Sequence, residues 1–380
     1  MSEAPLVIVP VDTAAEMDAF IKLPYRLHQD DPTWIPPLFL ERREVLDPKK
    51  NPYLKRATVK LWLAKRGDAV VGRISAQMDP LVAKQRSAEE GHFGMIAAED
   101  DPAIFKALTE TAEAWLRDHG ATVVFGPFNL NINEETGLLI NGRDTVPMMM
   151  MGHDYGYVAR HLEALGYHKG RDLNAYVWNV GGELPATLKA FEKRAPTKGM
   201  VVRPINMKDY RAEVGRLVQI FNDAWSENWG FVPMADDEVA HMANQLKPLI
   251  VPDLVWFVEM DGDPAAFLVC LPNINEAIAD LNGKLLPFGW ARLLWRLKVK
   301  GLKSARVPLL GVRKKYLNSM LGPFMTGSIM AKMYREVEKR GIETLEMSWV
   351  LEDNTAMNRL AEQMGGRHYK TYRIFQKSLT

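Results

Sequence analysis

Apolar and polar residues alternate in two segments of the chain in the manner of paired β-strands. Residues 59–78 hold two alternating runs around a tight turn, and residues 253–271 hold two more around Asp261 and Gly262. An Asp-Gly pair favours a two-residue hairpin turn, because such a turn needs residues that tolerate a positive φ. The pattern therefore predicts one antiparallel hairpin in each half of the chain.

A helix, a glycine and a strand follow each hairpin in the same order. Residues 103–120 and 326–341 are each predicted as a long helix that ends at a glycine suited to a C-cap. A shorter helix with its own glycine and strand covers residues 161–180 in the first half and 359–379 in the second. Hairpins and helix–strand pairs are common, so a chance succession is the alternative. Three blocks in one order nevertheless predict two copies of one α/β unit.

The spacing between the two copies shows where each has an insertion. Matching glycines lie 195, 221 and 199 residues apart in the hairpin, long-helix and short-helix blocks. The second half therefore carries 26 extra residues between its hairpin and its long helix, and the first half carries 22 between its central strand and its last helix. Loops on a rigid scaffold often carry function, so we expect the functional side chains in these insertions.

Composition narrows the class of protein. The chain has 380 residues, 47% of them hydrophobic, which suits a globular protein of two or three domains. A single cysteine excludes an internal disulfide framework, and no apolar stretch approaches the roughly 20 residues of a membrane span. The sequence shows no basic, apolar signal segment at its start, so a cytoplasmic protein is expected. Zinc-site, serine-hydrolase and Walker motifs do not occur, so no metal site is expected.

The order hairpin, long helix, strand, short helix, strand resembles the core of the Gcn5-related N-acyltransferases (GNAT). Residues 352–367 resemble the closing helix of that family, with Asn354, Ala356, Leu360 and Gly365 at the matching positions. The resemblance implies an α/β fold of two tandem GNAT-like units, with mixed central sheets flanked by helices. We place the units at residues 1–190 and 191–380.

The family binds the pyrophosphate of coenzyme A at a strand–helix junction, where free backbone amides favour an anion. The matching segment is residues 312–325, in which Gly322 keeps the family's glycine motif and Leu317 and Met320 depart from it. Because of this departure, an acyl carrier protein is an alternative to coenzyme A as the donor. The family's acid tyrosine falls on Ala361. The residues that the resemblance assigns to the donor are Arg313, Lys314, Lys315, Tyr316, Asn318, Gly322 and Asn354.

The first unit is further from the family pattern. Its matching junction, residues 97–103, is acidic and would repel a pyrophosphate. We therefore expect the N-terminal unit to form a substrate wall and the C-terminal unit to bind the donor. No permanently bound cofactor is expected, because acyl-coenzyme A or an acyl carrier protein would be a co-substrate.

A narrower resemblance extends over nearly the whole chain. Residues 23–38, 126–139, 221–233 and 371–379 resemble the tandem GNAT group that includes the bacterial ceramide synthases. The resemblance implies transfer of a long acyl chain from a thioester to the amine of a sphingoid-type lipid. Acyl transfer to a small soluble amine or a protein amine, and a non-catalytic acyl-thioester-binding protein, are the alternatives.

Positive charge is concentrated in the second insertion. Residues 281–335 contain twelve Lys and Arg residues and no Asp or Glu, so the rest of the chain has a net charge of −11. The basic insertion, about residues 283–306, has helical spacing that puts Trp290 and Leu294 on one face and Arg292 and Arg296 on the other. Such a helix, about residues 288–306, is typical of a segment that lies on an anionic membrane surface, here the inner membrane. An ordinary packed surface helix and a dock for an acidic carrier protein are the alternatives, and a nucleic-acid partner is not expected.

N-acylation requires a group that takes a proton from the amine and groups that polarise the thioester carbonyl. The first insertion supplies candidates for catalysis in Glu134, His153 and Tyr155. On an extended chain the alternating Asn129, Asn131 and Asn133 would share one face and bind substrate. The alternative for the asparagines is a turn-rich loop, and the alternative for the neighbouring Asp154 is a helix cap.

Two further groups of residues are candidates for the walls of the substrate site. In the second half, Asn222, Trp225, Asn228 and Trp229 are expected to bind substrate, with core stacking of the two tryptophans as the rival explanation. Four consecutive methionines, residues 148–151, suit an adaptable acyl-chain channel, although core packing is the commoner explanation.

Overall fold

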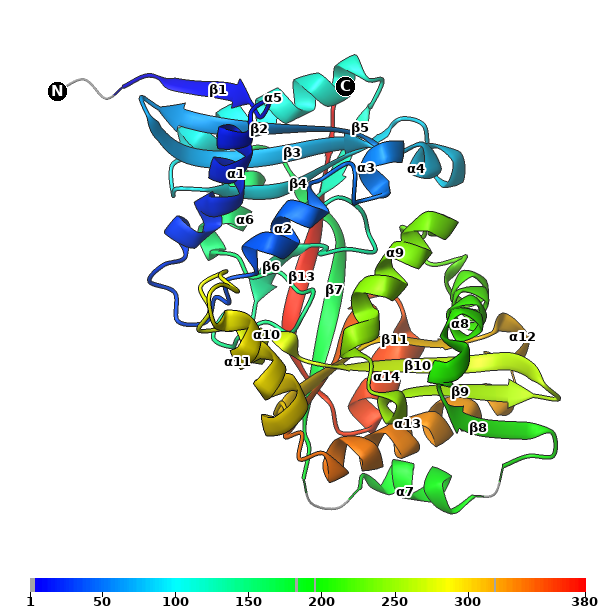
Figure 1. The fold of residues 1–380 in the computed structure, drawn as a ribbon. Coiled ribbons are helices and arrows are strands. Elements are labelled where there is room, and N and C mark those ends of the chain that lie inside the picture. Colours follow the sequence, from blue (N-terminus) through cyan, green and yellow to red (C-terminus); the bar gives the residue numbers. More distant parts are fainter. Residues whose placement is uncertain (1–3, 182–183, 195, 318) are drawn as a thin grey trace. The chain divides into compact units, whose positions relative to one another are not determined.

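The computed structural model describes residues 4–181, 184–194, 196–317 and 319–380, and it divides into two compact units (Figure 1). Unit 1 comprises the residues up to Leu173 together with Ile278–Pro287 and Lys370–Thr380, and unit 2 comprises Asn174–Ala277 and Phe288–Tyr369. The last strand of each sequence repeat therefore belongs partly to one unit and partly to the other. The boundary expected between residues 190 and 191 describes the repeat in the sequence and stays a prediction.

Unit 1 is a mixed sheet with helices on its faces. The strand order among its residues is β1-β2-β3-β4-β5-β13, with β6 paired to β13. Its strands are β1 (Leu6–Pro10), β2 (Thr58–Arg66), β3 (Ala69–Met78), β4 (Glu90–Ala98), β5 (Val123–Gly126), β6 (Leu138–Asn141), the first part of β7 (His168–Asn179) and most of β13 (Arg367–Ser378). Its helices are α1 (Ala14–Leu27), α2 (Phe39–Val45), α3 (Tyr53–Arg56), α4 (Pro80–Gln85), α5 (Pro102–Asp118) and α6 (Gly156–Ala164).

Unit 2 repeats the arrangement with the strand order β7-β12-β11-β10-β9-β8. Its strands are β8 (Met200–Pro204), β9 (Val255–Met260), β10 (Asp263–Pro272), β11 (Ser304–Val312), β12 (Thr344–Leu351) and the start of β13 (Arg367–Ser378). Its helices are α7 (Ala186–Lys193), α8 (Tyr210–Trp225), α9 (Asp236–Leu246), α10 (Ile274–Ile278), α11 (Gly289–Trp295), α12 (Lys314–Leu317), α13 (Leu321–Lys339) and α14 (Thr355–Gln363). Short turns complete it at η1 (Met207–Asp209), η2 (Lys247–Leu249), η3 (Pro252–Leu254) and η4 (Arg296–Lys300).

The turns and helix ends that the sequence predicts are confirmed. Asp261 and Gly262 join β9 to β10 with φ values of 52° and 86°. The long helices α5 and α13 stop just before Gly120 and Gly341, whose φ values are 89° and 66°. A residue with a side chain is strained at such a φ, which is why glycine ends these helices. The two copies of one α/β unit are therefore present in the fold.

Two helices cover opposite faces of the sheet in unit 2. Helix α13 packs on the face that carries Ala305, Val307, Leu345 and Met347. Helix α8 packs on the other face, where the Trp225 ring lies near Phe267 and over Gly311. A Cβ atom on Gly311 would come within 2.5 Å of the Trp225 ring, so only glycine lets the helix approach this closely. Side chains of β11 and β12 that point away from α13 therefore lie on the α8 face.

In unit 1 the segment that follows β5 fills the space beside the parallel strand β4. Strands β4 and β5 pair over Glu90 to His92 of β4. Beyond His92, residues that follow β5 pair with β4 instead. The amide of Phe128 donates to the Phe93 carbonyl at 2.8 Å, and the Gln77 amide group donates to the Phe128 carbonyl. A Cβ atom on Gly94 would lie 1.8 Å from the Phe128 oxygen. Unit 1 therefore has no room at this position for anything besides its own backbone.

The basic insertion differs from its prediction in length and orientation. Helix α11 ends at Trp295, continues as the π-helical turn η4 to Lys300, and stops at Gly301 with a φ of 75°, whereas residues 304–306 belong to β11. Arg296 is on the packed side, because its guanidinium donates to the Ala277 carbonyl at 2.8 Å. The predicted separation of one apolar and one basic face was therefore wrong. In the described part of the chain, no helix has the length and apolarity needed to cross a bilayer.

Candidate active site

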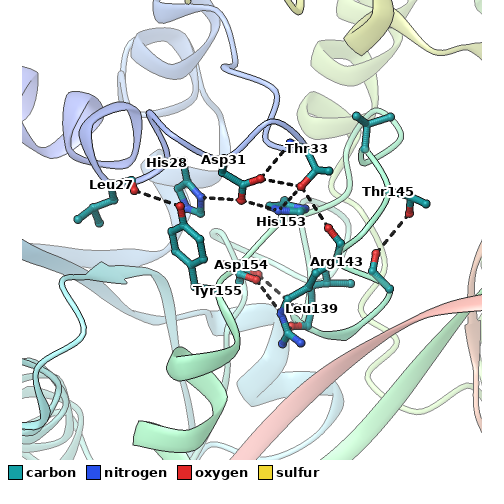
Figure 2. A network of polar contacts seen from close by, with 12 residues as sticks. Leu27, His28, Asp31, Thr33, Leu139, Arg143, Thr145, His153, Asp154 and Tyr155 are labelled. Atoms are coloured by element: carbon teal, nitrogen blue, oxygen red, sulfur yellow. Dashed lines mark hydrogen bonds and ion pairs between the residues drawn. The ribbon is translucent and has the colours of Figure 1, made fainter.

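The first insertion and the segment after α1 bring a group of polar side chains together in unit 1 (Figure 2). Nε2 of His153 lies 3.0 Å from the Asp31 carboxylate and 3.2 Å from the Thr33 hydroxyl. Thr33 in turn donates to Asp31 at 2.7 Å, so the carboxylate is fixed from two sides. His153 and Asp31 are separated by 122 residues in the sequence, and the fold alone makes them a pair.

The pairing sets the protonation of the two groups. Burial raises the pKa of Asp31, but hydrogen bonds from Thr33 and the nearby His153 outweigh it and hold that pKa at about 2. Burial lowers the pKa of His153, and the Asp31 charge offsets only part of this effect. A neutral imidazole bound to a carboxylate through Nε2 carries its lone pair on Nδ1. Among the described residues this buried Nδ1 has no hydrogen-bond partner.

His28 and Tyr155 build one wall of the same group. The His28 ring stacks on Tyr155 with centroids 4.5 Å apart and on Trp34 at 5.1 Å. Burial between these rings lowers the pKa of His28 to about 4, so it is neutral at pH 7. The Tyr155 hydroxyl donates to the Leu27 carbonyl at 3.3 Å, and burial raises its pKa. Tyr155 therefore positions His28, and its catalytic role stays a prediction.

Asp154 is not the helix cap that one reading of the sequence expected. Helix α6 has Tyr155 at its N-cap without a side-chain hydrogen bond, and the Asp154 carboxylate accepts instead from the Leu139 amide at 3.2 Å. Burial raises the pKa of Asp154 to about 6. Arg143 holds this corner by donating to the Asp154 and Ile140 carbonyls at 3.0 and 2.9 Å. Asp154 is thus a carboxyl group that titrates near neutral pH.

The predicted asparagine face does not exist, because residues 129–135 form turns and not an extended strand. Asn131 accepts from the Asn133 amide through its side chain and from the Glu134 amide through its carbonyl, which closes the turn. The turn-rich loop was therefore the correct alternative. Glu134 lies half-buried in this turn, and its role as a base stays a prediction.

Asn129 holds the loop to its surroundings. Its side chain accepts from the Met95 amide at 2.8 Å and donates to Glu135 at 3.0 Å. Glu135 also accepts from Arg42 at 2.8 Å. Burial raises the pKa of Glu135, but Arg42 and Asn129 outweigh it and hold that pKa below its ordinary value. Glu135, which the sequence did not select, is therefore held in a fixed position by Arg42 and Asn129.

In unit 2 the segment predicted as the donor junction lies between β11 and α13, with α12 inserted before the long helix. The Lys314 ammonium pairs with Glu227 at 2.5 Å, and its backbone amide donates to Asp223 at 2.7 Å. The Arg313 guanidinium donates to the Pro264 carbonyl at 3.4 Å. Two of the three predicted cations therefore already have protein partners.

The remaining donor candidates have structural roles of their own. A Cβ atom on Gly322 would lie 2.8 Å from the Tyr316 carbonyl oxygen, so glycine is needed for this close approach. The Lys315 ammonium lies 4.9 Å from the centre of the Tyr316 ring. Asn354 is the N-cap of α14 and accepts from the Met357 amide at 3.1 Å, which confirms the predicted cap. Asn318 lies outside the described residues. Donor binding by these side chains stays a prediction.

The substrate candidates of the second half lie at and after the end of α8. Trp225 stacks on Phe221 with ring centroids 4.8 Å apart, as the core-stacking alternative expects. Asn222 keeps a buried side-chain oxygen without a hydrogen-bond partner among the described residues. Asn228 and Trp229 are half-buried in the turn that follows. In unit 1, Met148, Met149 and Met151 are buried, as packing predicts.

Sequence reasoning missed Asp31, the partner that orients His153. The only available signal was its place in residues 23–38, one of the segments on which the family resemblance rests. Spacing in the sequence gives no sign of a contact across 122 residues. The polar group in unit 1 therefore combines the predicted His153 and Tyr155 with Asp31, Thr33 and His28, which were not predicted.

Comparison with known proteins identifies the family. No protein-family model matches the chain. The chain is 52% identical to a protein of Caulobacter vibrioides named bacterial ceramide synthase, over 100% of this chain and 99% of that protein. It is 48% identical to the protein YghO of Escherichia coli, over 96% of this chain and 93% of that protein.

Solved structures agree on the fold. A tandem GNAT protein from the clavulanic acid biosynthesis pathway has a TM-score of 0.57 at 13% identity, with 99% of each chain covered. A GCN5-related N-acetyltransferase from Sphaerobacter thermophilus has a TM-score of 0.51 at 13% identity, with 99% of this chain and 97% of that chain covered. The chain therefore belongs to the tandem GNAT-fold N-acyltransferase family that includes the bacterial ceramide synthase.

Proposed function

We propose that this N-acyltransferase moves a long-chain acyl group from a thioester to the amine of a sphingoid-type lipid. The observation that carries the proposal is the full-length likeness to a protein named bacterial ceramide synthase, at 52% identity. The two proteins also cover each other almost completely. The acceptor is therefore proposed to be a lipid amine and not a small soluble amine.

The reaction has two protons to move. A lipid amine at neutral pH is an ammonium group, and it must lose one proton before its lone pair can attack the thioester carbonyl. The addition product loses a second proton as the C–N bond forms and the C–S bond breaks. One proton ends on the thiolate and the other is released to water. We propose that Nδ1 of His153 accepts one of these protons, because Asp31 fixes the ring and stabilises its cation.

The proposed donor site is the junction between β11 and α13. The first turn of α13 offers few free amides, since Leu321 donates to the Ser319 hydroxyl at 3.2 Å and Pro323 has no amide hydrogen. Beside it, Met320 is 83% exposed and Leu317 is half-exposed, near the basic Lys315. A basic surface with apolar side chains suits an acidic carrier protein better than it suits a free pyrophosphate. We therefore propose an acyl carrier protein as a donor beside coenzyme A.

The proposed membrane contact is the segment from Phe288 to Lys300, which comprises α11 and η4. It exposes large apolar side chains that a protein in water normally buries: Phe288 is 74% exposed, Trp290 52%, Trp295 54% and Val299 71%. Lys298 and Lys300 are exposed among them. Aromatic side chains beside lysines are typical of a helix that lies at the headgroup level of an anionic membrane. We propose that the enzyme is peripheral to such a membrane, where its lipid acceptor resides.

Reconstitution tests the proposal directly. The purified chain is incubated with a long-chain acyl-coenzyme A, or with the acyl carrier protein thioester, and with a sphingoid base in vesicles of phosphatidylglycerol and phosphatidylethanolamine. Mass spectrometry is expected to detect the N-acyl lipid, and a soluble amine such as glucosamine is expected to give none. An amide of glucosamine without an amide of the sphingoid base would overturn the lipid acceptor.

A further inference from the structure

A second polar group lies inside unit 2, on strands that also carry apolar core residues. Glu346 of β12 has no exposed surface, and Ser348 and Arg306 are 2% and 4% exposed. Their neighbours on the same strands, Ala305, Val307, Leu345 and Met347, all belong to the apolar core under α13. Because side chains alternate along a strand, the three polar residues point to the opposite face, which is the face that α8 covers.

Glu346 is the centre of this group. One carboxylate oxygen accepts from the Ser348 hydroxyl and lies 3.6 Å from Nε of Arg306. The other oxygen accepts from the hydroxyl of Tyr369, at the start of β13. Arg306 also donates to the Ser348 hydroxyl at 2.8 Å and to the Ser348 carbonyl at 3.1 Å. The buried carboxylate is therefore held in one orientation, and the half-buried Tyr369 is the most exposed member of the group.

The group lies where two parallel strands part. Among the described residues the pairing of β11 with β12 ends at Val307 and Met347, although the strands continue to Val312 and Leu351. Arg306 and Glu346 form the pair just before this point, and Ser348 is the first side chain after it on the same face. In unit 1 the chain itself fills the matching position through Phe128, whose carbonyl accepts from the Gln77 side chain.

Stability does not account for a carboxylate at this position. Removing a carboxylate or a guanidinium from water costs several kcal/mol, and apolar side chains of similar size often serve as well or better. Buried ionisable groups with specific partners cluster at functional sites for this reason. Ser348, Arg306 and Tyr369 all converge on one carboxylate, which suggests that its charge and orientation are what the group maintains.

We propose that Tyr369 is a catalytic residue of the N-acyl transfer and that Glu346 is the positioning residue behind it. The Tyr369 oxygen accepts a proton from the ammonium group of the acceptor as its own proton passes to Glu346. An N–H bond breaks, an O–H bond forms on Tyr369, and the original tyrosine proton forms an O–H bond on the carboxylate. After C–N bond formation and C–S cleavage, the proton returns through Tyr369 and leaves on the thiolate. The inference rests on the proposed acyl transfer and adds the group that takes the first of its two protons.

Unit 1 offers a matched control for this pair. The hydroxyl of Tyr167 donates to Glu113 at 2.9 Å, and both residues are buried, with the Lys377 ammonium 2.8 Å from the same carboxylate. The pair joins α5 to the residue before β7 and lies outside the described polar groups. Tyr167→Phe and Glu113→Gln therefore remove the same kind of hydrogen bond without touching the proposed machinery.

The test compares these four variants with the wild type by steady-state kinetics across pH. Tyr369→Phe and Glu346→Gln are expected to lower kcat about 100-fold or more at pH 7, the usual size of a proton-transfer effect. KM for the thioester and the melting temperature of Tyr369→Phe are expected to stay at the values of the Tyr167→Phe control. The loss should shrink as pH rises, because an acceptor that is already a free amine no longer needs the relay.

Three outcomes would overturn the assignment. They are an unchanged kcat in Tyr369→Phe, a loss of the same size at every pH, and a loss that the Tyr167→Phe control shares. If Glu346→Gln does not fold, Tyr369→Phe decides alone. If the wild type acylates only a soluble amine, the lipid acceptor is wrong, and the same comparison on that amine still decides the role of Tyr369. An absence of thiol release from the wild type with any amine would overturn both proposals.

Discussion

Replacing Trp290 and Trp295 together by alanine is predicted to weaken membrane binding strongly. Each ring is about half exposed, at 52% and 54%. A tryptophan offers up to ~250 Å², so each leaves roughly 100 Å² of ring to bury, worth about 2.5 kcal/mol at ~25 cal/mol per Å². The two rings together therefore contribute at most about 5 kcal/mol, and even a third of that value lowers the partition coefficient about tenfold.

Sedimentation with vesicles measures this loss. Vesicles of pure phosphatidylcholine and vesicles with added phosphatidylglycerol separate the apolar from the electrostatic contribution. Lys298→Glu with Lys300→Glu is expected to abolish the preference for phosphatidylglycerol at low salt, since each cation near an anionic surface contributes about 1 kcal/mol. Arg296 is unsuitable for this purpose, because its guanidinium donates to the Ala277 carbonyl inside the unit.

Val201 on β8 provides the matched control for the double tryptophan variant. It is also exposed, at 51%, but it lies outside the basic segment, so Val201→Ala should sediment like the wild type. Unchanged sedimentation of the double tryptophan variant would refute the interfacial reading of α11. Equal losses in that variant and in Val201→Ala would refute it as well.

Three further predictions concern unit 1. Asp31→Asn is expected to cost about 2 kcal/mol at pH 7, because a carboxyl whose pKa is held at about 2 stabilises the fold above pH ~4 and loses that contribution as pH falls toward 2. Denaturant melts of both proteins should show the difference fall to about a third of its pH 7 value at pH ~2.5. The wild type should lose up to about 3 kcal/mol between pH ~6.5 and pH 4, because the unfolded chain takes up a proton that buried His28 does not. His28→Phe, which keeps the stack with Trp34 and Tyr155, should flatten that dependence, and an equally steep curve would contradict it. Gly94→Ala should cost about 3 kcal/mol or more in unfolding free energy, since its Cβ would lie 1.8 Å from the Phe128 oxygen and displace buried hydrogen bonds; a smaller loss in thermal melts would show that the crossing chain yields.

The elements of the fold follow from local patterns in the sequence. The Asp-Gly turn at Asp261 and the glycines that end α5 and α13 depend on the conformation of one or two residues, so spacing and composition locate them. Because the same local patterns occur in the same order in both halves, they predicted the fold of the whole chain. The faces of α11 were predicted less well, because the packing of Arg296 against Ala277 depends on the neighbouring element and not on helical spacing.

The candidate site was only partly accessible from the sequence. His153 was chosen for its chemistry, and the structure gives it a fixed carboxylate partner. Asp31 and Tyr369 were missed because the proposed role of each depends on a contact with a residue on another element of the fold. Glu346 and Ser348 did leave a signal: two polar residues alternate within the apolar strand TLEMSWVL, where a buried strand would otherwise be apolar throughout.

The proposed donor chemistry depends on the contrast between the two units. In unit 1 the backbone around Phe128 fills the position next to β4, whereas in unit 2 strands β11 and β12 part beside a polar group. The acidic junction at residues 97–103 agrees with this difference, since it would repel an anionic donor. Both observations support assigning the thioester to unit 2.

Lipid mass spectrometry of a strain that lacks this protein tests the proposed acylation of a sphingoid lipid in the cell. N-acylated sphingoid lipids are expected to disappear and the free sphingoid amine to accumulate, and the wild-type gene is expected to restore the amide whereas a gene encoding Tyr369→Phe is not. A deletion strain with an unchanged set of amide-linked sphingoid lipids would contradict it.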